Sequence, residues 1–322
     1  MEPRLVLKAA GFIFLDTVGI PGNLTILLFF ARLSYFQGKL QTSDVIITHL
    51  ASFNLVVVLL RGIPQALTAL GYRNLFNDNG CKAVIYIYRI CRAMSICVTC
   101  LLSCYQCVLV GPGTGKWLLL KKRLPQSVPY IVLFLCALNC IVCTATAQYT
   151  FAYFNSTIPE FTLNLEFCIV TYPSYLFYLG NGVLYILRDL FFVILMALAA
   201  GYIISLLYHH GKQMKSMQTS DRNQKKTADA SKAVLALVTM YVILFSLDNI
   251  VWIYTLCVTR VHPAVSDTRV FLASCYSAFS PILIIATNKR FAITLSCTQA
   301  IQKESKQTAG TTTTQVHKSN EE

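Results

Sequence analysis

The stretch that decides the fold is residues 182–208, which read GVLYILRDLFFVILMALAAGYIISLLY. A transmembrane helix needs about 20 mostly apolar residues, because each residue advances about 1.5 Å through about 30 Å of hydrocarbon. This stretch exceeds that length and contains only two charged residues, Arg188 and Asp189. In lipid, the backbone groups of a segment must hydrogen-bond within that segment, so we expect a membrane-spanning helix here.

Six similar stretches lie on either side of it. The seven predicted spans are residues 9–31, 45–70, 83–110, 128–147, 182–208, 233–258 and 268–287. The composition agrees, since 55% of the 322 residues are hydrophobic and 13% are charged, against about 25% charged in soluble domains. The sequence predicts an all-α membrane protein, with a seven-transmembrane helix bundle in residues 1–296 and a disordered tail in residues 297–322. The number of spans excludes a soluble enzyme.

The basic residues predict the orientation of the bundle. If the N-terminus is outside, most of the 27 Lys and Arg residues fall in the inner loops and the tail, as the positive-inside rule requires. Arg4 and Lys8 are local exceptions. We therefore expect an extracellular N-terminus and a cytoplasmic C-terminus. The formal net charge of +13 is then explained by topology and membrane lipid, and no nucleic-acid partner is expected.

Seven charged residues lie well inside the predicted spans, away from their ends, where each costs at least about 2.5–3.5 kcal/mol. Arg89 and Arg92 share a face of the third span, because residues three apart are neighbours on a helix. They lie roughly 12 and 16 Å below Cys81, a depth that suits a ligand cavity. The other five are Arg61, Arg188, Asp16, Asp189 and Asp248. The predicted ligand-binding residues are Tyr88, Arg89, Arg92, Arg188, Asp189 and Asp248.

Two interpretations of these charges stay open. Unpaired guanidinium groups can form a fork onto a carboxylate or sulfate of a small ligand. Alternatively, the three aspartates neutralise three of the four arginines as internal ion pairs. The first interpretation predicts that Arg92→Ala abolishes the response to an acidic agonist while surface expression persists. The aromatic residues that could line such a cavity are Tyr86, Tyr88, Tyr149, Tyr153, Phe154 and Tyr254. The alternative for each of them is ordinary packing or a place in the aromatic belt at the membrane interface.

Two further motifs concern modification and nucleotide binding. Asn155-Ser156-Thr157 is a glycosylation acceptor in the long loop before the fifth span. Asn23-Leu24-Thr25 lies inside the first span and should not be modified. Residues 111–116, GPGTGK, suggest a phosphate-binding loop, but the pattern needs Gly at position 110 and Ser or Thr at position 117. The chain has Val110 and Trp117 there, so we expect an inner-loop turn.

Short motifs along nearly the whole chain carry a resemblance to a known family. They are Gly22-Asn23-Leu24-Thr25-Ile26-Leu27-Leu28, His49-Leu50-Ala51 with Asn54, Gly62-Ile63-Pro64-Gln65, Leu101-Leu102-Ser103-Cys104-Tyr105-Gln106, Asn155-Ser156-Thr157 with Cys168, Tyr208-His209-His210, and Ser280-Pro281. Together they make the chain resemble the vomeronasal type-1 receptors, including their fish relatives, the class A-related olfactory receptors.

The resemblance implies a rhodopsin-like G-protein-coupled receptor in the plasma membrane of chemosensory neurons. It implies a small odorant or pheromone as ligand, bound between the third, fifth, sixth and seventh spans, and an inhibitory-type heterotrimeric G protein as partner. It also favours a disulfide between Cys81 and Cys168, which both face the oxidising side in the expected orientation. No cofactor, no metal site and no catalytic residue is expected.

Other residues are expected to face partners inside the cell. Tyr105 and Gln106 stand where rhodopsin-like receptors usually have Asp-Arg-Tyr, so the activation switch must differ from the usual one. These two residues are predicted to face the G protein, together with Lys225, Lys226 and Lys232. Attraction of these lysines to anionic lipid is the alternative. In the tail, Cys297 is a candidate for palmitoylation, and phosphorylated Thr residues could recruit an arrestin.

Two other functions remain alternatives. Bitter-taste receptors share several of the departures from the usual rhodopsin-like motifs. A small-solute transporter would also carry charged residues inside its helices, although no inverted repeat of the kind common in transporters is visible. Signalling that depends on ligand and G protein would favour a receptor, whereas uptake or ion current without a G protein would favour transport.

Overall fold

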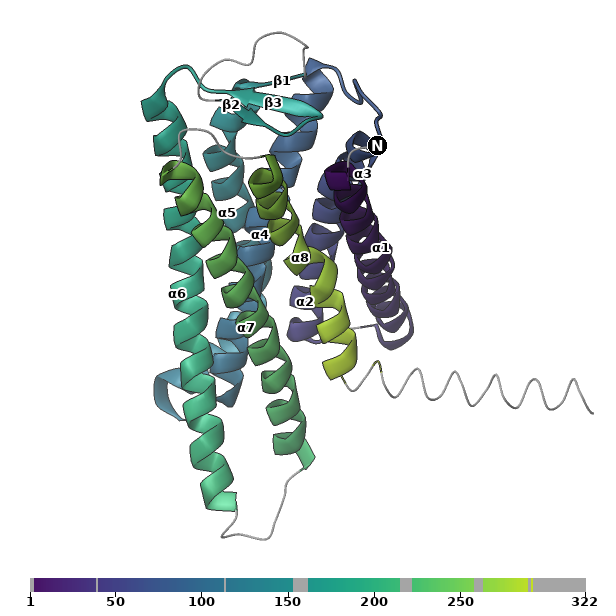
Figure 1. Ribbon diagram of the computed structural model, residues 1–322. Coiled ribbons are helices and arrows are strands. Elements are labelled where there is room, and N and C mark those ends of the chain that lie inside the picture. Colours follow the sequence, from purple (N-terminus) through teal and green to yellow (C-terminus); the bar gives the residue numbers. More distant parts are fainter. Residues whose placement is uncertain are drawn as a thin grey trace, which may run out of the picture.

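The computed structural model describes residues 3–38, 40–112, 114–152, 162–214, 222–257, 263–288 and 291. Seven helices in these ranges are long and apolar enough to cross a membrane, which confirms the predicted seven-helix bundle (Figure 1). The elements are α1 (Pro3–Gln37), α2 (Thr42–Val57), the π-helical turn η1 (Val58–Gly62), α3 (Ile63–Ala69), α4 (Asp78–Val110), α5 (Gly115–Gln148), β1 (Thr150–Ala152), β2 (Thr162–Asn164), β3 (Cys168–Thr171), α6 (Tyr175–Met214), α7 (Arg222–Cys257) and α8 (Pro263–Thr287).

The second span is α2, η1 and α3 in continuous succession. The wide π-helical turn comes just before Pro64, which has no N–H to donate and whose ring clashes with a regular α-helical turn. Gly62 closes this turn, and a Cβ atom at Gly62 would lie only 1.7 Å from Asp16 Oδ1. Only glycine therefore lets the Asp16 carboxyl group of α1 lie against this part of the second span.

Several helices extend beyond the predicted spans. The basic segment 116–123, expected in an inner loop, lies on α5, which begins at Gly115. Its start is fixed by Trp117, which stacks on Tyr202 with 5.6 Å between ring centroids, and by Lys121, which donates to the Gly111 carbonyl at 2.7 Å. Likewise, α7 begins at Arg222, within the predicted polar loop. Hydropathy detects only the lipid-facing part of a helix, so it missed these polar ends.

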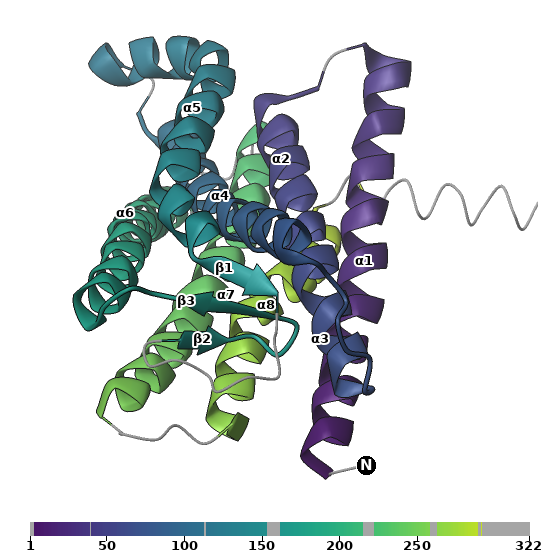
Figure 2. The ribbon, with the colours of Figure 1, turned by 90° about the horizontal axis from the view of Figure 1, so that it is seen from above.

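A small antiparallel sheet lies at one end of the bundle, and the sequence analysis did not predict it. Its strand order is β1-β3-β2, with Phe151 paired to Ile169 and Leu163 paired to Val170. The sheet crosses the end of the bundle near the N-terminus (Figure 1) and, seen from above, overlaps α4, α7 and α8 (Figure 2). We call this end the sheet end, and we call residues 149–174 the sheet loop.

The centre of the bundle is α4, whose apolar window is 78% buried. It packs against α2, α5, α6 and α7. A buried, neutral polar network links it to α2 and α8: the Asn54 amide donates to Ser280 Oγ at 2.8 Å and accepts from Ser95 Oγ at 2.5 Å. One turn along α4, the hydroxyl groups of Thr99 and Tyr276 lie 2.6 Å apart and share a hydrogen bond. These contacts join three helices across the middle of the bundle.

Candidate ligand-binding site

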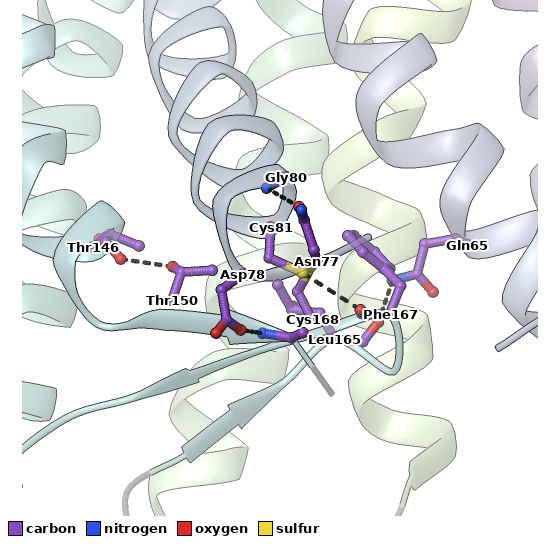
Figure 3. Close-up of a disulfide and its surroundings, with 11 residues drawn as sticks. Gln65, Asn77, Asp78, Gly80, Cys81, Thr146, Thr150, Leu165, Phe167 and Cys168 are labelled. Atoms are coloured by element: carbon purple, nitrogen blue, oxygen red, sulfur yellow. Dashed lines mark hydrogen bonds between the residues drawn. A yellow bond between two sulfur atoms is a disulfide. The ribbon is translucent and has the colours of Figure 1, made fainter. Parts of the chain in front are cut away.

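A disulfide between Cys81 and Cys168 anchors the sheet loop to the start of α4, as predicted (Figure 3). Both cysteines are fully buried. The adjacent turn is capped by Asn77, whose side chain accepts from the Gly80 N–H at 2.8 Å. Gln65 of α3 donates to the Leu165 carbonyl at 3.1 Å. The disulfide and this hydrogen bond hold residues 165–168 over the bundle from two sides.

A cavity of about 150 Å³ lies below this part of the loop. Its wall comes from η1, α4, α6, α7, α8 and two residues of the sheet loop, Leu165 and Tyr172. Arginines dominate its polar lining: Arg61, Arg89, Arg92, Arg188 and Arg269. Asp248 is the only acidic residue in the described lining, and four tyrosines complete the polar surface. The cavity therefore carries an excess of positive charge inside a membrane-spanning bundle.

Three of the five arginines are paired with aspartates. Arg92 Nη2 lies 3.1 Å from Asp248 Oδ2, and Arg269 Nε lies 3.6 Å from Asp248 Oδ1. Arg188 binds Asp189, its neighbour in sequence, through Nε at 2.9 Å and Nη2 at 2.7 Å. Asp189 lies beside the cavity and not in its lining. Internal ion pairing, the second of the two interpretations above, therefore applies to Arg92 and Arg188. Arg269, which was not among the four arginines of that interpretation, shares the carboxylate of Asp248 with Arg92.

The other two arginines have no carboxylate partner among the described residues. Arg61 is 5% exposed, and its guanidinium lies 5.0 Å from the centre of the Tyr88 ring and 6.0 Å from that of Phe167. Arg89 lies 4.9 Å from the centre of the Tyr185 ring. Asp16, which that second interpretation also invoked, forms no ion pair with any residue that the structure describes; its Oδ1 lies against Gly62. The second interpretation expected three aspartates to balance three of the buried arginines, and only Asp189 and Asp248 do so.

The structure brings together most of the predicted ligand-binding residues and adds others. Tyr88, Arg89, Arg92, Arg188 and Asp248 all line the cavity. The additions, which sequence reasoning missed as binding residues, are Arg61, Arg269, Tyr172, Tyr178 and Tyr185. Arg269 was counted with the outer loop because it is only the second residue of the predicted seventh span, whereas α8 begins six residues earlier, at Pro263.

The other aromatic residues predicted for the cavity do not line it, as far as the structure describes them. Tyr86 turns away from the cavity and donates to the Cys140 carbonyl at 3.0 Å. Tyr149 packs against Tyr172 and Phe177 in the sheet loop and the start of α6. Tyr254 is exposed on α7. None of these three is in the described lining. Tyr153 and Phe154 lie outside the described residues.

The remaining predicted sites lie elsewhere. Tyr105 and Gln106 are buried near the end of α4 opposite the sheet, and Lys232 is exposed near the same end of α7. The side chains of Lys225 and Lys226 lie outside the described part of the chain, as do residues 155 and 297, which carry the predicted glycosylation and palmitoylation sites. These roles stay predictions. The other acceptor asparagine, Asn23, is buried and donates to the Gly19 and Ser277 carbonyls.

A second charged cluster lies at the sheet end, between α1, the sheet loop and α8. Lys8 Nζ lies 2.5 Å from Glu166 Oε2 and 2.9 Å from Asp267 Oδ1. Arg4 contacts the same two carboxylates, at 3.0 Å and 3.3 Å. We call Arg4, Lys8, Glu166 and Asp267 the rim cluster. It explains the two basic residues that were exceptions to the predicted charge distribution.

A seven-helix membrane bundle with a charged cavity under a disulfide-anchored loop is the architecture of a receptor for small molecules. Comparison with known proteins specifies the family. The model of the "Vomeronasal organ pheromone receptor family" matches residues 9–297. Over 304 residues the chain is 40% identical to "Olfactory receptor class A-like protein 1" of Danio rerio, covering 94% of this chain and 96% of that protein. It is 28% identical over 286 residues to human "Vomeronasal type-1 receptor 1", covering 88% and 80%.

The chain belongs to the vomeronasal organ pheromone receptor family, which includes vomeronasal type-1 and class A-like olfactory receptors. It is therefore a chemosensory receptor and a multi-pass plasma-membrane protein, and not an enzyme. This confirms the resemblance found in the sequence. The matches favour this function over the bitter-taste and transporter alternatives.

Proposed function

We propose that this receptor binds a small anionic ligand, such as a carboxylate or sulfonate, in the arginine-lined cavity and activates a heterotrimeric G protein of the inhibitory type. The observation that carries the proposal is the pair Arg61 and Arg89, which have no carboxylate partner among the described residues. Guanidinium groups bind carboxylates and sulfonates through two parallel hydrogen bonds. A ligand anion would supply the negative charge that the cavity wall lacks.

The size and surface of the cavity limit the ligand. A cavity of about 150 Å³ matches the volume known to hold one benzene molecule. The rings of Tyr88 and Tyr185 already lie against arginines, and Tyr172 and Tyr178 complete an aromatic wall. The preferred ligand is therefore an acid of about the size of one ring, with an apolar body that contacts the tyrosines.

The orientation of the bundle follows from the same proposal. The sheet end faces the exterior of a chemosensory neuron, where the oxidising environment permits the disulfide and the ligand can reach the cavity. The opposite end then faces the cytoplasm. There, Tyr105, Gln106, Lys225, Lys226 and Lys232 would meet the G protein when α7 moves, and the lysines would also attract anionic lipid. Epitope tags on the two termini of the receptor should lie on opposite sides of the membrane.

Modifications complete the proposed arrangement. Asn155 would carry a glycan on the exterior, and Cys297 would carry a palmitoyl group at the start of a cytoplasmic tail, residues 297–322. Phosphorylation of the threonines in this tail would recruit an arrestin.

The anionic-ligand proposal is tested in cells that express the receptor with a promiscuous G protein. The probes are hexanoate, benzoate and benzenesulfonate, each beside its neutral amide. Responses to the anions and not to the amides are expected. Arg61→Gln and Arg89→Gln should each raise the half-maximal concentration by at least about tenfold, because a hydrogen bond to a charged group contributes about 1.5–3 kcal/mol.

Lys82→Gln is the matched control, since Lys82 also lies on α4 but contacts Phe151 outside the cavity. It should leave the response unchanged. Equal responses to anions and amides, or unchanged responses in both arginine variants at normal surface expression, would contradict the proposal. Co-expression with single Gα subunits then tests the inhibitory type.

A further inference from the structure

Asp248 occupies an unusual position among the charges of the cavity. It lies on α7 and contacts arginines of two other helices, Arg92 of α4 and Arg269 of α8. By contrast, the Arg188–Asp189 ion pair lies within α6, and Arg188 reaches α5 only through a hydrogen bond to the neutral Asn139. Asp248 is therefore the described acidic group that ties α7 to the rest of the cavity wall.

We propose that Asp248 is an internal counter-ion that takes the place of the ligand's anionic group in the ligand-free receptor. In this proposal, the arriving anion binds Arg92, Asp248 transfers to Arg269, and the ionic contact between α4 and α7 is lost. The inference rests on the proposed function, because it needs an anionic ligand to displace Asp248. It assigns Asp248 to the control of activation and not to direct ligand contact.

The contacts of Asp248 suit such an exchange. Its Oδ2 accepts a hydrogen bond from Arg92 at 3.1 Å, whereas its Oδ1 lies 3.6 Å from Arg269 and has no hydrogen bond to the described residues. The side chain of Asp248 is only 10% exposed, but those of Arg92 and Arg269 are 31% and 32% exposed, and both line the cavity. A ligand can therefore reach the arginines without first uncovering the aspartate.

The exchange leaves Asp248, Arg92 and Arg269 each beside an opposite charge. Removing a partner from a buried ion pair is costly because the remaining charge is left without compensation. Here the ligand anion replaces Asp248 on Arg92, and Arg269 stays within reach of Asp248. No group that takes part in the exchange loses its opposite charge, so the ligand needs only a small difference in affinity to shift the two states.

The structure also provides a chain of contacts from Asp248 to the middle of the bundle. A second, smaller cavity of about 20 Å³ lies next to Arg92 and Asp248 and is also lined by Ser95, Tyr241 and Tyr276. Tyr241 lies about two helical turns from Asp248 on α7 and packs edge-on against Tyr276, with 4.9 Å between ring centroids. Tyr276 in turn shares its hydrogen bond with Thr99. A shift of α7 at Asp248 would thus reach the polar network in the middle of the bundle.

The first test measures signalling of the full-length receptor without ligand, normalised to surface expression. Asp248→Asn removes the charge and should raise basal signalling by about fivefold or more, the lower range of typical coupling between sites. Asp248→Glu, which keeps the charge, should signal less without ligand than Asp248→Asn. The double variant Arg92→Asp with Asp248→Arg restores an ion pair between α4 and α7 and should also signal less without ligand than Asp248→Asn. Asp267→Asn, in the rim cluster, is the control and should not raise basal signalling.

The second test does not depend on a G protein. In the purified receptor, hydrogen exchange of the α7 amides between residues 231 and 251 should be faster in Asp248→Asn than in Asp248→Glu. Unchanged basal signalling together with unchanged hydrogen exchange in Asp248→Asn would overturn the inference, even if hexanoate or benzoate activates the receptor. Raised basal signalling or faster hydrogen exchange in a receptor that ignores every anion would support the ionic tie between α4 and α7 as the control of activation, but would overturn the proposed ligand class and the displacement of Asp248 by an anion. If no variant signals, the hydrogen-exchange rates of the α7 amides alone decide whether the inference holds.

Discussion

The rim cluster and the cavity arginines are two groups of basic residues at the same end of the bundle, and they differ in how their charges are balanced. In the rim cluster, both Arg4 and Lys8 contact both Glu166 and Asp267. In the cavity, five arginines line the wall together with one aspartate, and a second aspartate lies beside it. The balanced cluster holds three elements together, whereas in the proposed function the unbalanced one receives an anion from outside.

The difference matters because both groups lie in partly buried surroundings. A buried charge without a partner costs several kcal/mol, so a buried charge is normally compensated by an opposite charge or by hydrogen bonds. Lys8 is 3% exposed and meets this condition through two carboxylates. Arg61 is 5% exposed and meets it only partly, through aromatic rings. Arg61 is thus the clearest sign that the cavity is built for a ligand.

Loss of the disulfide should have the largest effect, because it breaks both regions at once. The sheet loop supplies Glu166 to the rim cluster and Leu165 and Tyr172 to the cavity. Cys168→Ser should cost about 2–4 kcal/mol of stability and abolish most surface expression and ligand response. Surface labelling and signalling measure both effects.

The matched control is Cys136→Ser, which changes a half-buried free cysteine of α5. It should be expressed and should signal normally. The double variant Cys81→Ser with Cys168→Ser should resemble Cys168→Ser alone, since either change removes the same bond. A receptor with Cys168→Ser that reaches the surface and responds normally would show that the loop does not depend on the disulfide.

Breaking the rim cluster should reduce stability without changing ligand preference. Lys8→Met leaves Glu166 and Asp267 without their most buried cation, and we expect a loss of about 1–3 kcal/mol, discounted because both carboxylates are partly exposed. Adding Asp267→Asn should cost less than the sum of the single changes, because one carboxylate no longer needs a partner. Thermal unfolding of the purified receptor measures this coupling.

The same variants should leave the half-maximal concentration of an activating anion within about twofold of the unmodified receptor, once surface expression is equal. This result would separate the rim cluster from the cavity. A tenfold change in Lys8→Met would instead show that the two charged groups act as one site.

Much of the fold could be predicted from the sequence, because hydropathy and helix length determine the spans directly. The pattern of residues 182–208 alone indicates one transmembrane helix, and six others follow in the same way. The sheet could not be predicted, because β1, β2 and β3 are only three or four residues long. Such short strands depend on their partners and on the disulfide, and not on a local pattern.

The site could be predicted in part. Burial of charge in a span indicated Arg89, Arg92, Arg188 and Asp248, and the structure places all four around one cavity. Pairing could not be deduced, because it depends on how helices far apart in sequence are rotated against each other. Arg61 shows the limit: the sequence places it inside a span, but only the structure shows that the π-helical turn directs it to Tyr88 and the cavity.

The smallest predicted effect concerns Tyr88, whose ring lies against the guanidinium of Arg61. Tyr88→Phe keeps the ring face and should change the half-maximal concentration of an activating anion by less than about twofold. Tyr88→Leu removes the ring, and with it a cation–π contact of about 0.5–2 kcal/mol, so a loss of several-fold is expected. The order Tyr, Phe, Leu should appear in a dose–response series at equal surface expression. If Tyr88→Phe raised the half-maximal concentration as much as Tyr88→Leu does, the hydroxyl group would be the important feature. The ring would then not be what holds Arg61 in place for an anion.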